Sequence, residues 1–494
     1  MLEAFMYRGL PSQLFLENAA NMDLVQHRYR PGRLSDYRIY EAYYHGEQNT
    51  KVLDRARMYI QASGFRWCEN LCDIAVNAAA NRMILNGTHV TAAGADRDDL
   101  KQVLDDAWDA NKGDMLQGTV HTETKKLGDG FLIVGFDQLT MLPTYDFNPA
   151  DQVKVVYSSD NVHRKVYASK VWRSHEESPL NPSGKEIRRM NIYWPDRIEK
   201  YYNPSTDGDW HPFLDMDDTV QLPAGPNGEI ATSPVWPLPW TLDNTPFGLP
   251  RGIPVFHFAN KRQKFMYGLS DLHKAVSMQD AFNKHVLDVF EIADHMAWPQ
   301  RWATGVNRRE QGSLDTTPAS VWTAGADNAK FGQFPAADMS NALAMLESDL
   351  QRFAALTETP LFALLMNGQW PSGEALRTAE APLVSRIVRE QPSFGAEWET
   401  AQLYGLGLYS TAMGLALPAG LKCHADWRDP FTRGQQEQMQ FVEGLVRLGL
   451  SAETALTMVG IEDAGIELEK TAIQKQAEAD ARVASMAKGL LPGM

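Results

Sequence analysis

The most constraining feature of this sequence is a pair of long amphipathic helices separated by a short segment of β-strand character. Apolar residues recur at steps of three and four over residues 269–297 and again over residues 338–358, which predicts two helices. At about 1.5 Å per residue, the first helix would be about 43 Å long and the second about 30 Å. The intervening residues 298–337 contain two strand-like runs, RWATGV and SVWTAG. A lone helix of this length cannot keep an apolar stripe in water, so we expect packing against further copies of the chain.

The rest of the chain predicts an α+β fold that is mainly helical. Helical spacing marks WCENLCDIAVNAAANRMILNG and residues 97–111, 114–127 and 374–414, the last with breaks expected at Pro382 and Pro392. Between about 150 and 260, the runs VKVVY, KVYASKVW, MNIYWP, RIEKYYN and IPVFHF predict antiparallel strands. A buried strand is expected in GDGFLIVGF, and the chain after Pro430 is expected to be helical. Since single cores stop growing near ~250–300 residues, we expect two or three structural regions.

Composition and cysteine usage exclude several classes of protein. The formal net charge is −15, so the chain is a poor candidate for gripping nucleic acid, although it could surround DNA without holding it. The three cysteines, Cys68, Cys72 and Cys423, indicate a reducing compartment without disulfides. Cys68 and Cys72 are interpreted as buried helix thiols rather than half of a metal site. No secretion signal or membrane span is read, so we expect a cytoplasmic protein before assembly.

Catalytic motifs are absent from the sequence. There is no phosphate-binding loop, no Gly-x-Gly-x-x-Gly, no His-Glu-x-x-His and no Gly-x-Ser-x-Gly. Aspartate clusters near residues 96–99 and 215–218 lack the other ligands of a calcium loop and are interpreted as solvated turns. His273 and His285 are interpreted as ordinary surface polar contacts. We therefore expect no enzyme, no cofactor and no metal, and favour a structural or assembly role.

Four segments follow one another in an informative order. YEAYYHG, predicted to end a helix at Gly46, comes first; GIPVFHFANK then leads through YGLSDLHKAVSMQDAFNKHVLDVFEIADHMAWPQRWATG. TETPLFALL and PSGEALRTAEAPLV follow, and ADWRDPFTRGQQEQ comes last. Together these segments resemble the portal proteins of tailed bacteriophages, in the siphophage-type branch. The resemblance covers most of the chain, and the β-rich stretch 150–250 carries little of it.

The resemblance implies a portal-type architecture with wing, stem, clip and crown regions. Transferred to this sequence, it places the wing at 1–268, the first stem helix at 269–297, the clip at 298–337, the second stem helix at 338–358, the tunnel loop at 359–377, the wing helix at 378–429 and the helical crown at 430–494. It also implies a ring, usually of twelve subunits, at a capsid vertex of the virion. Such a ring is a conduit for DNA packaging and ejection.

The resemblance also implies a set of partners. These are further copies of the chain, terminase, a major capsid or scaffold protein, and a head-completion (adaptor) protein. Double-stranded DNA would pass through the ring without sequence-specific binding, and no membrane is implied.

The charges of the predicted stem helices suggest how DNA would pass. The first helix has two lysines against five carboxylates, a net charge of −3, and the second, counted over residues 338–357, has one arginine against three carboxylates, a net charge of −2. Acidic stems around a pore would repel phosphates and keep DNA sliding, because each Lys or Arg contact with a phosphate adds affinity. The candidate lumen residues are Asp280, Asp288, Glu291 and Asp294. Alternatively, these charges face solvent or form pairs between helices.

Two further sets of side chains are candidates for DNA contact. The tunnel-loop set is Asn367, Gly368, Gln369 and Trp370, which could touch the duplex backbone without reading sequence or pack on a neighbouring subunit. The clip set is Arg301, Arg308, Arg309 and Lys330, in a region with a net charge of +1. These cations could contact DNA or form salt bridges between subunits.

Two other function classes remain open. One is a phage-encoded nuclease whose metal ligands are not close in sequence, which DNA cleavage in the presence of magnesium or manganese would reveal. The other is a different virion connector ring, which the length of the chain and its helix–β–helix order disfavour.

Overall fold

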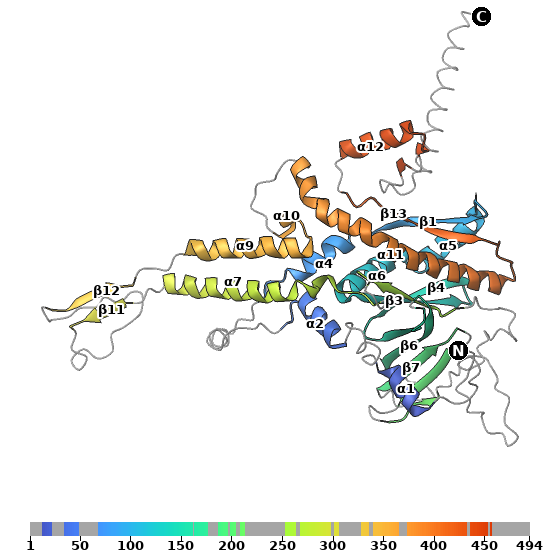
Figure 1. The fold of residues 1–494 in the computed structure, drawn as a ribbon, viewed down its shortest axis with the longest axis horizontal. Coiled ribbons are helices and arrows are strands. Elements are labelled where there is room, and N and C mark those ends of the chain that lie inside the picture. The colour runs from blue at the N-terminus through green and yellow to red at the C-terminus, as the bar shows by residue number, and fades with distance from the viewer. Residues whose placement is uncertain are drawn as a thin grey trace, which may run out of the picture. The chain divides into compact units, whose positions relative to one another are not determined.

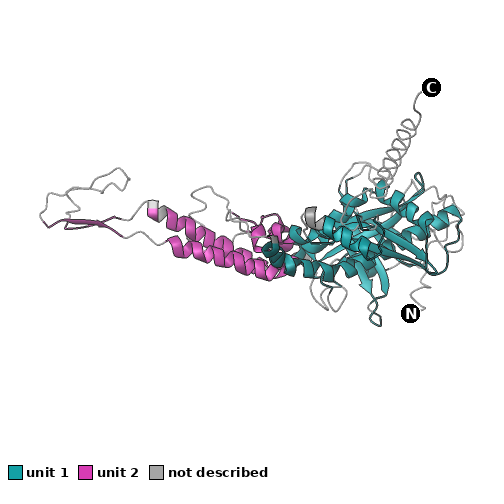
Figure 2. Ribbon diagram, turned by 90° about the horizontal axis from the view of Figure 1, so that it is seen from above, with its two compact units in different colours: residues 1–38, 77–270, 371–494 teal, residues 39–76, 271–370 magenta. Residues whose placement is uncertain are grey.

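The computed structural model groups the chain into two compact units (Figure 2). Unit 1 comprises Met1–Arg38, Asn77–Ser270 and Pro371–Met494, and unit 2 comprises Ile39–Val76 and Asp271–Trp370. The structure describes residues 12–21, 34–48, 68–161, 163–175, 186–195, 198–203, 208–212, 252–262, 267–297, 301–305, 328–334, 339–364, 373–431, 435–452 and 455–456. Helices and strands are mixed in it, as the predicted α+β class requires.

Unit 1 contains a three-stranded antiparallel sheet with the order β10-β3-β4. Its elements are α5 (Asp98–Ala110), α6 (Gly113–Leu127), β3 (Asp129–Asp137), β4 (Leu142–Pro149) and β10 (Val255–Ala259). The two predicted helices and the strand in GDGFLIVGF are thereby confirmed. Gly128 ends α6 in the left-handed region, with φ of 100°. A Cβ there would lie 2.8 Å from the backbone nitrogen of Ser270, so the turn into β3 requires glycine.

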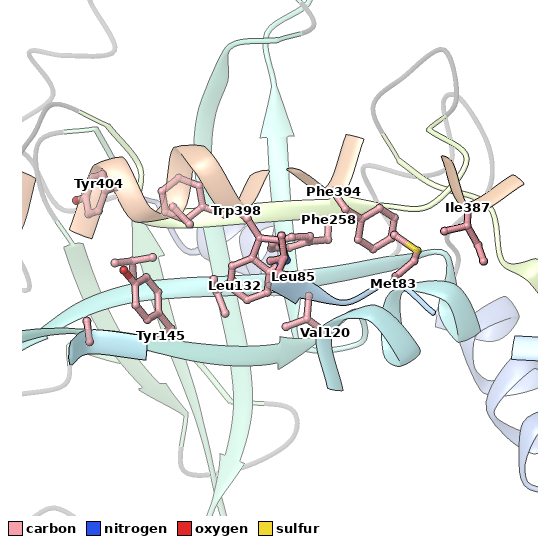
Figure 3. Packing of buried hydrophobic residues seen from close by; sticks show 14 of the residues in the cluster. Met83, Leu85, Val120, Leu132, Tyr145, Phe258, Ile387, Phe394, Trp398 and Tyr404 are labelled. Carbon is pink, nitrogen blue, oxygen red and sulfur yellow. The ribbon is translucent and has the colours of Figure 1, made fainter. Parts of the chain in front are cut away.

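Helix α11 (Gly373–Met413) packs on this sheet and continues through Pro382 and Pro392. The breaks expected at the two prolines are therefore wrong. A proline inside a helix costs about 3 kcal/mol, but burial of side chains on both sides of each proline offsets that cost. The core side chains of α11, labelled in Figure 3, are Ile387, Phe394, Trp398 and Tyr404, and they pack with Met83, Leu85, Val120, Leu132, Tyr145 and Phe258.

A second three-stranded sheet in unit 1, with the order β13-β1-β2, was not predicted. Its strands are β1 (Leu85–Ala92), β2 (Ala95–Asp96) and β13 (Leu421–Trp427). The helix expected to continue through NRMILNG is shorter, because α4 spans only Cys72–Ala80. Cys72 is a buried helix thiol as expected, whereas Cys68 precedes the helix and is only partly buried.

The β-rich stretch of unit 1 forms a five-stranded antiparallel sheet in sequence order, β5-β6-β7-β8-β9. The strands are β5 (Val153–Tyr157), β6 (Lys165–Ser174), β7 (Ile187–Tyr193), β8 (Ile198–Asn203) and β9 (His211–Pro212). All five predicted runs between 150 and 260 are strands, the fifth being β10. Helix α1 (Gln13–Ala20) packs on this sheet. The buried Nζ of Lys154 donates to the carbonyl oxygens of Asn18 at 2.6 Å and Asn21 at 2.7 Å, and so caps the helix.

Unit 2 is built around two helices that lie side by side (Figure 1), α7 (Val276–Ala297) and α9 (Met339–Thr357). The other elements are the 3-10 turn η2 (Asp271–His273), the antiparallel strands β11 (Arg301–Thr304) and β12 (Lys330–Gln333), and α10 (Leu361–Leu364). The predicted strand SVWTAG lies outside the described residues.

The first long helix begins later than residue 269. The amide of Leu269 donates to the carbonyl of Asn260 at 2.7 Å, and the Asn260 side chain donates back to the carbonyl of Leu269. The carbonyl of Leu269, which would accept from an amide one turn later if a helix began there, is thus paired with the Asn260 side chain instead.

Two further helices lie near the two ends of the chain. Helix α2 (Leu34–Tyr44) is followed by Gly46 in the left-handed region, with φ of 67°, which confirms the predicted stop. Helix α12 (Gln435–Arg447) confirms helical structure after Pro430.

Candidate functional site

Half of the predicted functional residues, six of twelve, fall on the segment of unit 2 that we call the hairpin: α7, β11, β12 and α9 (Figure 1). The buried side chains of α9 are Ala342, Asp349, Leu350, Phe353, Ala354 and Thr357. Those of α7 include Phe282, Val286 and Leu287. Both sets recur at steps of three and four, as expected for helices packed along their length. Part of the predicted apolar stripe is therefore used within a single copy of the chain.

A polar contact also joins the two helices of the hairpin. His285 Nδ1 lies 2.5 Å from Asp349 Oδ2, and the Asp349 side chain is buried. The interpretation of His285 as an ordinary surface contact is therefore wrong, since its partner is 64 residues away in the sequence. His273 Nδ1 lies 3.1 Å from the hydroxyl of Tyr40. Sequence spacing could not reveal either partner, because neither lies within one helical turn of its histidine.

The base of α7 is held by buried amide side chains. Gln279 accepts a hydrogen bond from the backbone amide of Leu71 at 2.9 Å and donates to the carbonyl of Glu69 at 2.6 Å. Asn283 accepts from the amide of Glu69 at 3.2 Å. Both amides are almost fully buried, so each bond is shielded from competition by water. These residues fix where the hairpin leaves the rest of unit 2.

The four predicted lumen carboxylates have different surroundings. Asp280 accepts a hydrogen bond from the hydroxyl of Tyr43 at 2.5 Å, and burial together with this contact raises the pKa of Tyr43. Asp288 pairs with Lys284 at 2.6 Å, one helical turn earlier. Glu291 is half-buried, and the side chain of Asp294 lies outside the described part of the chain. Asp280 and Asp288 thus already have partners within one copy.

The tip of the hairpin is the two-stranded ribbon of β11 and β12. Arg301 pairs with Gln333 and Thr304 with Lys330, so alternation places the predicted basic residues Arg301 and Lys330 on opposite faces. Both are exposed. A Cβ at Gly332 would lie 2.5 Å from the Trp302 ring, which shows that the indole covers this glycine. Arg308 and Arg309 lie outside the described residues, as do Asn367, Gly368, Gln369 and Trp370.

Large apolar side chains remain exposed along the hairpin. They are Phe290, Met296, Trp302, Phe331, Phe334, Leu343, Met345 and Leu356, each between 37% and 55% exposed. They occur on both helices and on the tip. A series of exposed apolar side chains along one element is typical of a protein–protein contact.

No catalytic or metal centre emerges from the part of the chain that the structure describes. Within it, no group of three or more His, Cys, Asp or Glu side chains is placed to hold a metal ion. No helix among the same residues is long and apolar enough to cross a bilayer.

One buried network in unit 1 escaped sequence reasoning altogether. Asp129 lies 2.8 Å from His257 Nε2 and accepts hydrogen bonds from the Tyr37 hydroxyl and the Gly268 amide. His257 Nδ1 lies 2.8 Å from the hydroxyl of Tyr157. Asp129 and His257 have no exposed surface, so the network anchors the fold rather than presenting a reactive group. Its members come from distant parts of the sequence, and no local motif marks them.

Comparison with known proteins identifies similar chains over most of the sequence. The family model described as "Phage portal protein, SPP1 Gp6-like" matches residues 30–481. The portal protein of Mycobacterium phage L5 is 24% identical over 376 residues, which cover 72% of this chain and 68% of that protein. The portal protein of Mycobacterium phage D29 is 30% identical over 204 residues, or 39% of this chain and 41% of that protein.

A solved structure titled "Virion of native gene transfer agent (GTA) particle" also aligns with this chain. The TM-score is 0.41 at 12% identity, over 86% of this chain and 99% of the other.

Proposed function

Because this chain belongs to the SPP1 Gp6-like family of phage portal proteins, we propose that twelve copies form a closed ring at one capsid vertex. The observation that carries the proposal is the series of apolar side chains left exposed along the hairpin. Copies standing side by side around an axis would cover these side chains. A closed ring repeats one heterologous interface, so the two flanks of each hairpin would be complementary.

Within this proposal, the parts of the chain take the regions of a portal subunit. The helices α7 and α9 would form the stem, the ribbon of β11 and β12 the clip, and residues 359–377 the tunnel loop. Residues 1–268 and 378–429 would form the wing, and residues 430–494 the crown. The position of the ribbon between the two hairpin helices supports this order.

The ring would act as a conduit for DNA during packaging and ejection. Carboxylates on a pore wall repel phosphates, so the DNA would slide without being held. The candidate carboxylates are Asp280, Asp288, Glu291 and Asp294, of which Asp280 is engaged by Tyr43 and Asp288 by Lys284 within one copy.

The basic residues of the clip and the polar and aromatic residues of the tunnel loop would have separate roles. Arg301 and Lys330 lie on opposite faces of the ribbon, so one could face the DNA while the other faces a neighbouring copy. Asn367, Gly368, Gln369 and Trp370 would contact the duplex backbone without reading its sequence.

The partners proposed for the ring are those expected of a portal. Terminase would dock during packaging, a head-completion protein afterwards, and the major capsid or scaffold protein would surround the ring. A nuclease is the less favoured alternative, because the family is structural and the described residues hold no cluster of metal ligands. A different connector ring is disfavoured by the family match over residues 30–481.

The experiment that tests the conduit replaces Glu291 by lysine in a packaging system. DNase-protected DNA per head should fall in Glu291→Lys heads, because a ring of new cations would hold phosphates. The matched control is Glu17→Lys, which makes the same charge change at an exposed position of α1 in unit 1, within the proposed wing. Equal packaging by both variants would remove Glu291 from the lumen, and normal packaging in heads without this chain would refute the conduit itself.

A further inference from the structure

Unit 1 contains a groove that none of the proposed portal functions uses. Its volume is about 910 Å³, and it lies between the first half of β1 and the helices α5 and α6. Its lining includes Asn86, Gly87 and Thr88 of β1, Trp108 of α5 and Gln117 of α6. Thr88 is anchored at the floor, because its hydroxyl donates to Gln402 Oε1 at 2.6 Å.

One side of β1 is open to this groove. Along its other side β1 pairs with β13, whereas β2 covers only Thr91 and Ala92. The carbonyl of Val90 accepts from the amide of Arg97 on the β2 side. Since alternate residues of an antiparallel strand face opposite neighbours, the amide and carbonyl of Thr88 also face that side. In the described part of the chain, no strand lies against Thr88 there.

The open side of β1 is short, because the backbone groups at both of its ends already have hydrogen-bond partners. At its start, Gln117 satisfies the backbone of Leu85, accepting from the amide at 2.8 Å and donating to the carbonyl at 3.4 Å. At its other end lies the pairing with β2. The exposed sheet edge between these ends fits a few residues of an extended peptide, which is the geometry of strand addition.

The lining of the groove carries three aspartates, Asp105, Asp109 and Asp114, and two cations, Lys101 and Arg428. Asp105 is neutralised by Lys101 at 2.8 Å. Asp114 accepts from two neutral donors, Trp108 Nε1 and Gln117 Nε2, each at 3.2 Å. No described Lys or Arg forms an ion pair with Asp109 or Asp114, and both are exposed. An arriving peptide that carries Arg or Lys would therefore find two carboxylates without a cation.

The sequence of the chain contains a segment with matching chemistry. Residues 24–30 read LVQHRYR, in which Val25, His27 and Tyr29 alternate with Gln26, Arg28 and Arg30. In an extended peptide this alternation places the two arginines on one side.

We propose that residues 24–30 of a second copy of this chain add to the open side of β1, with Arg28 and Arg30 against Asp109 and Asp114. The inference rests on the ring proposed above, which supplies the further copies of the chain. The segment is tied at both ends to its own subunit, through the Asn21 carbonyl on Lys154 and the Tyr37 hydroxyl on Asp129. The twelve residues 22–33 could reach about 20 Å outward and return, at ~3.3–3.6 Å per residue. Each copy would thus bind its neighbour through residues 24–30, at a site separate from the hairpin.

Disulfide cross-linking of the full-length chain tests this contact. The variant Arg28→Cys/Asp109→Cys is purified, mildly oxidised and run on a denaturing gel without reductant. The matched control, Arg28→Cys/Asp106→Cys, moves the second thiol to an exposed position of α5 that does not line the groove. Docking should give on the order of tenfold more intermolecular product than the control, because it raises the local thiol concentration towards the millimolar range.

Each result of this experiment decides the inference. A ladder of cross-linked chains, abundant for Asp109 and weak for Asp106, supports it. A faster-migrating single chain would show that the segment fills its own groove and would overturn the exchange between copies. A yield no higher than in the control overturns the docking altogether.

Sedimentation of the same sample before oxidation separates this failure from failure of the proposed function. If the chain sediments as rings but gives no cross-link, the proposed ring stands and only the contact between residues 24–30 and β1 is overturned. If the chain sediments as a monomer, both the ring and the contact between residues 24–30 and β1 are contradicted.

Discussion

The two units of this protein differ in which side chains they bury: unit 1 buries charged groups, whereas unit 2 leaves large apolar groups exposed. Unit 1 buries even its charges with partners: Lys125 donates to Glu390, and Arg386 Nε lies 3.4 Å from the same carboxylate. Unit 2 buries one side of each hairpin helix and leaves large side chains such as Leu343 exposed. Since a packed core is the main source of stability, unit 1 is expected to be stable by itself. Unit 2 is expected to need contacts from further copies.

The largest effect is expected from breaking the buried ion pairs of unit 1. Burial alone would raise the pKa of Glu390, but Lys125 and Arg386 lower it, so the group is a carboxylate at neutral pH. Glu390→Ala would leave two buried cations without their carboxylate and should lower the free energy of unfolding by about 3–5 kcal/mol. Denaturant unfolding followed by tryptophan fluorescence measures it. The control Glu374→Ala, at an exposed position of the same helix, should change less than about 0.5 kcal/mol; equal losses would contradict the contrast between the units.

A second prediction is that the stability of unit 1 falls at low pH because of a buried histidine. His121 is buried, accepts from Trp398 Nε1 at 3.0 Å and donates from Nδ1 to the carbonyl of Met83 at 2.7 Å. Burial lowers its pKa to about 3 from an ordinary value of 6.5. The unfolded chain therefore binds this proton first, so the stabilisation is complete above pH 6.5 and is lost as the pH falls towards 3.

Unfolding free energies measured at several pH values test this sign. Between pH 6 and pH 4, the free energy of unfolding of the unsubstituted chain should fall by about 1.4 kcal/mol per pH unit more than that of the His121→Gln variant. The glutamine has no proton to bind. Parallel pH profiles for the two proteins would show that the buried imidazole is not responsible.

The third prediction shifts the comparison to unit 2. Gln279→Leu removes the partners of the Leu71 amide and the Glu69 carbonyl, which leaves two inner backbone groups unsatisfied and should cost about 1–3 kcal/mol. Hydrogen exchange should quicken at residues 69–76 and along α7 while α11 keeps its protection. The control Lys274→Leu changes an exposed side chain and should leave exchange unaltered. Equal loosening of α11 would mean that the units do not unfold separately.

The smallest effect is expected at the surface of the hairpin. Lys284 and Asp288 form an ion pair whose side chains are each more than 40% exposed. Lys284→Ala should change the free energy of unfolding by only about 0.3–0.5 kcal/mol, because water and salt screen the pair. A loss above 1 kcal/mol in the isolated chain would show that this surface is less open than the structure indicates.

How much the sequence could predict depends on how local each signal is. The hairpin helices, four of the five strands in the five-stranded sheet and the stop at Gly46 follow from periodicity and turn residues within a few positions. The pairing of β1 with β13 does not, because each strand is short and its partner is far away in the chain. Pro382 and Pro392 misled the prediction, since packing of α11 outweighs their local cost.

The candidate site divides in the same way. The identity of the charged residues on α7 could be read directly, but their surroundings could not. That Asp280 is engaged by Tyr43, and that His285 pairs with Asp349, depends on side chains from other elements.

The most direct test of the central claim is the mass of the purified chain in solution, measured by mass photometry. We expect particles of many copies, with negative-stain images of closed rings around a central hole. Leu343→Asp should shift the chain to single copies by placing a charge in the contact. A wild-type chain that remains a monomer at high concentration would contradict the claim that the exposed side of the hairpin is completed by further copies.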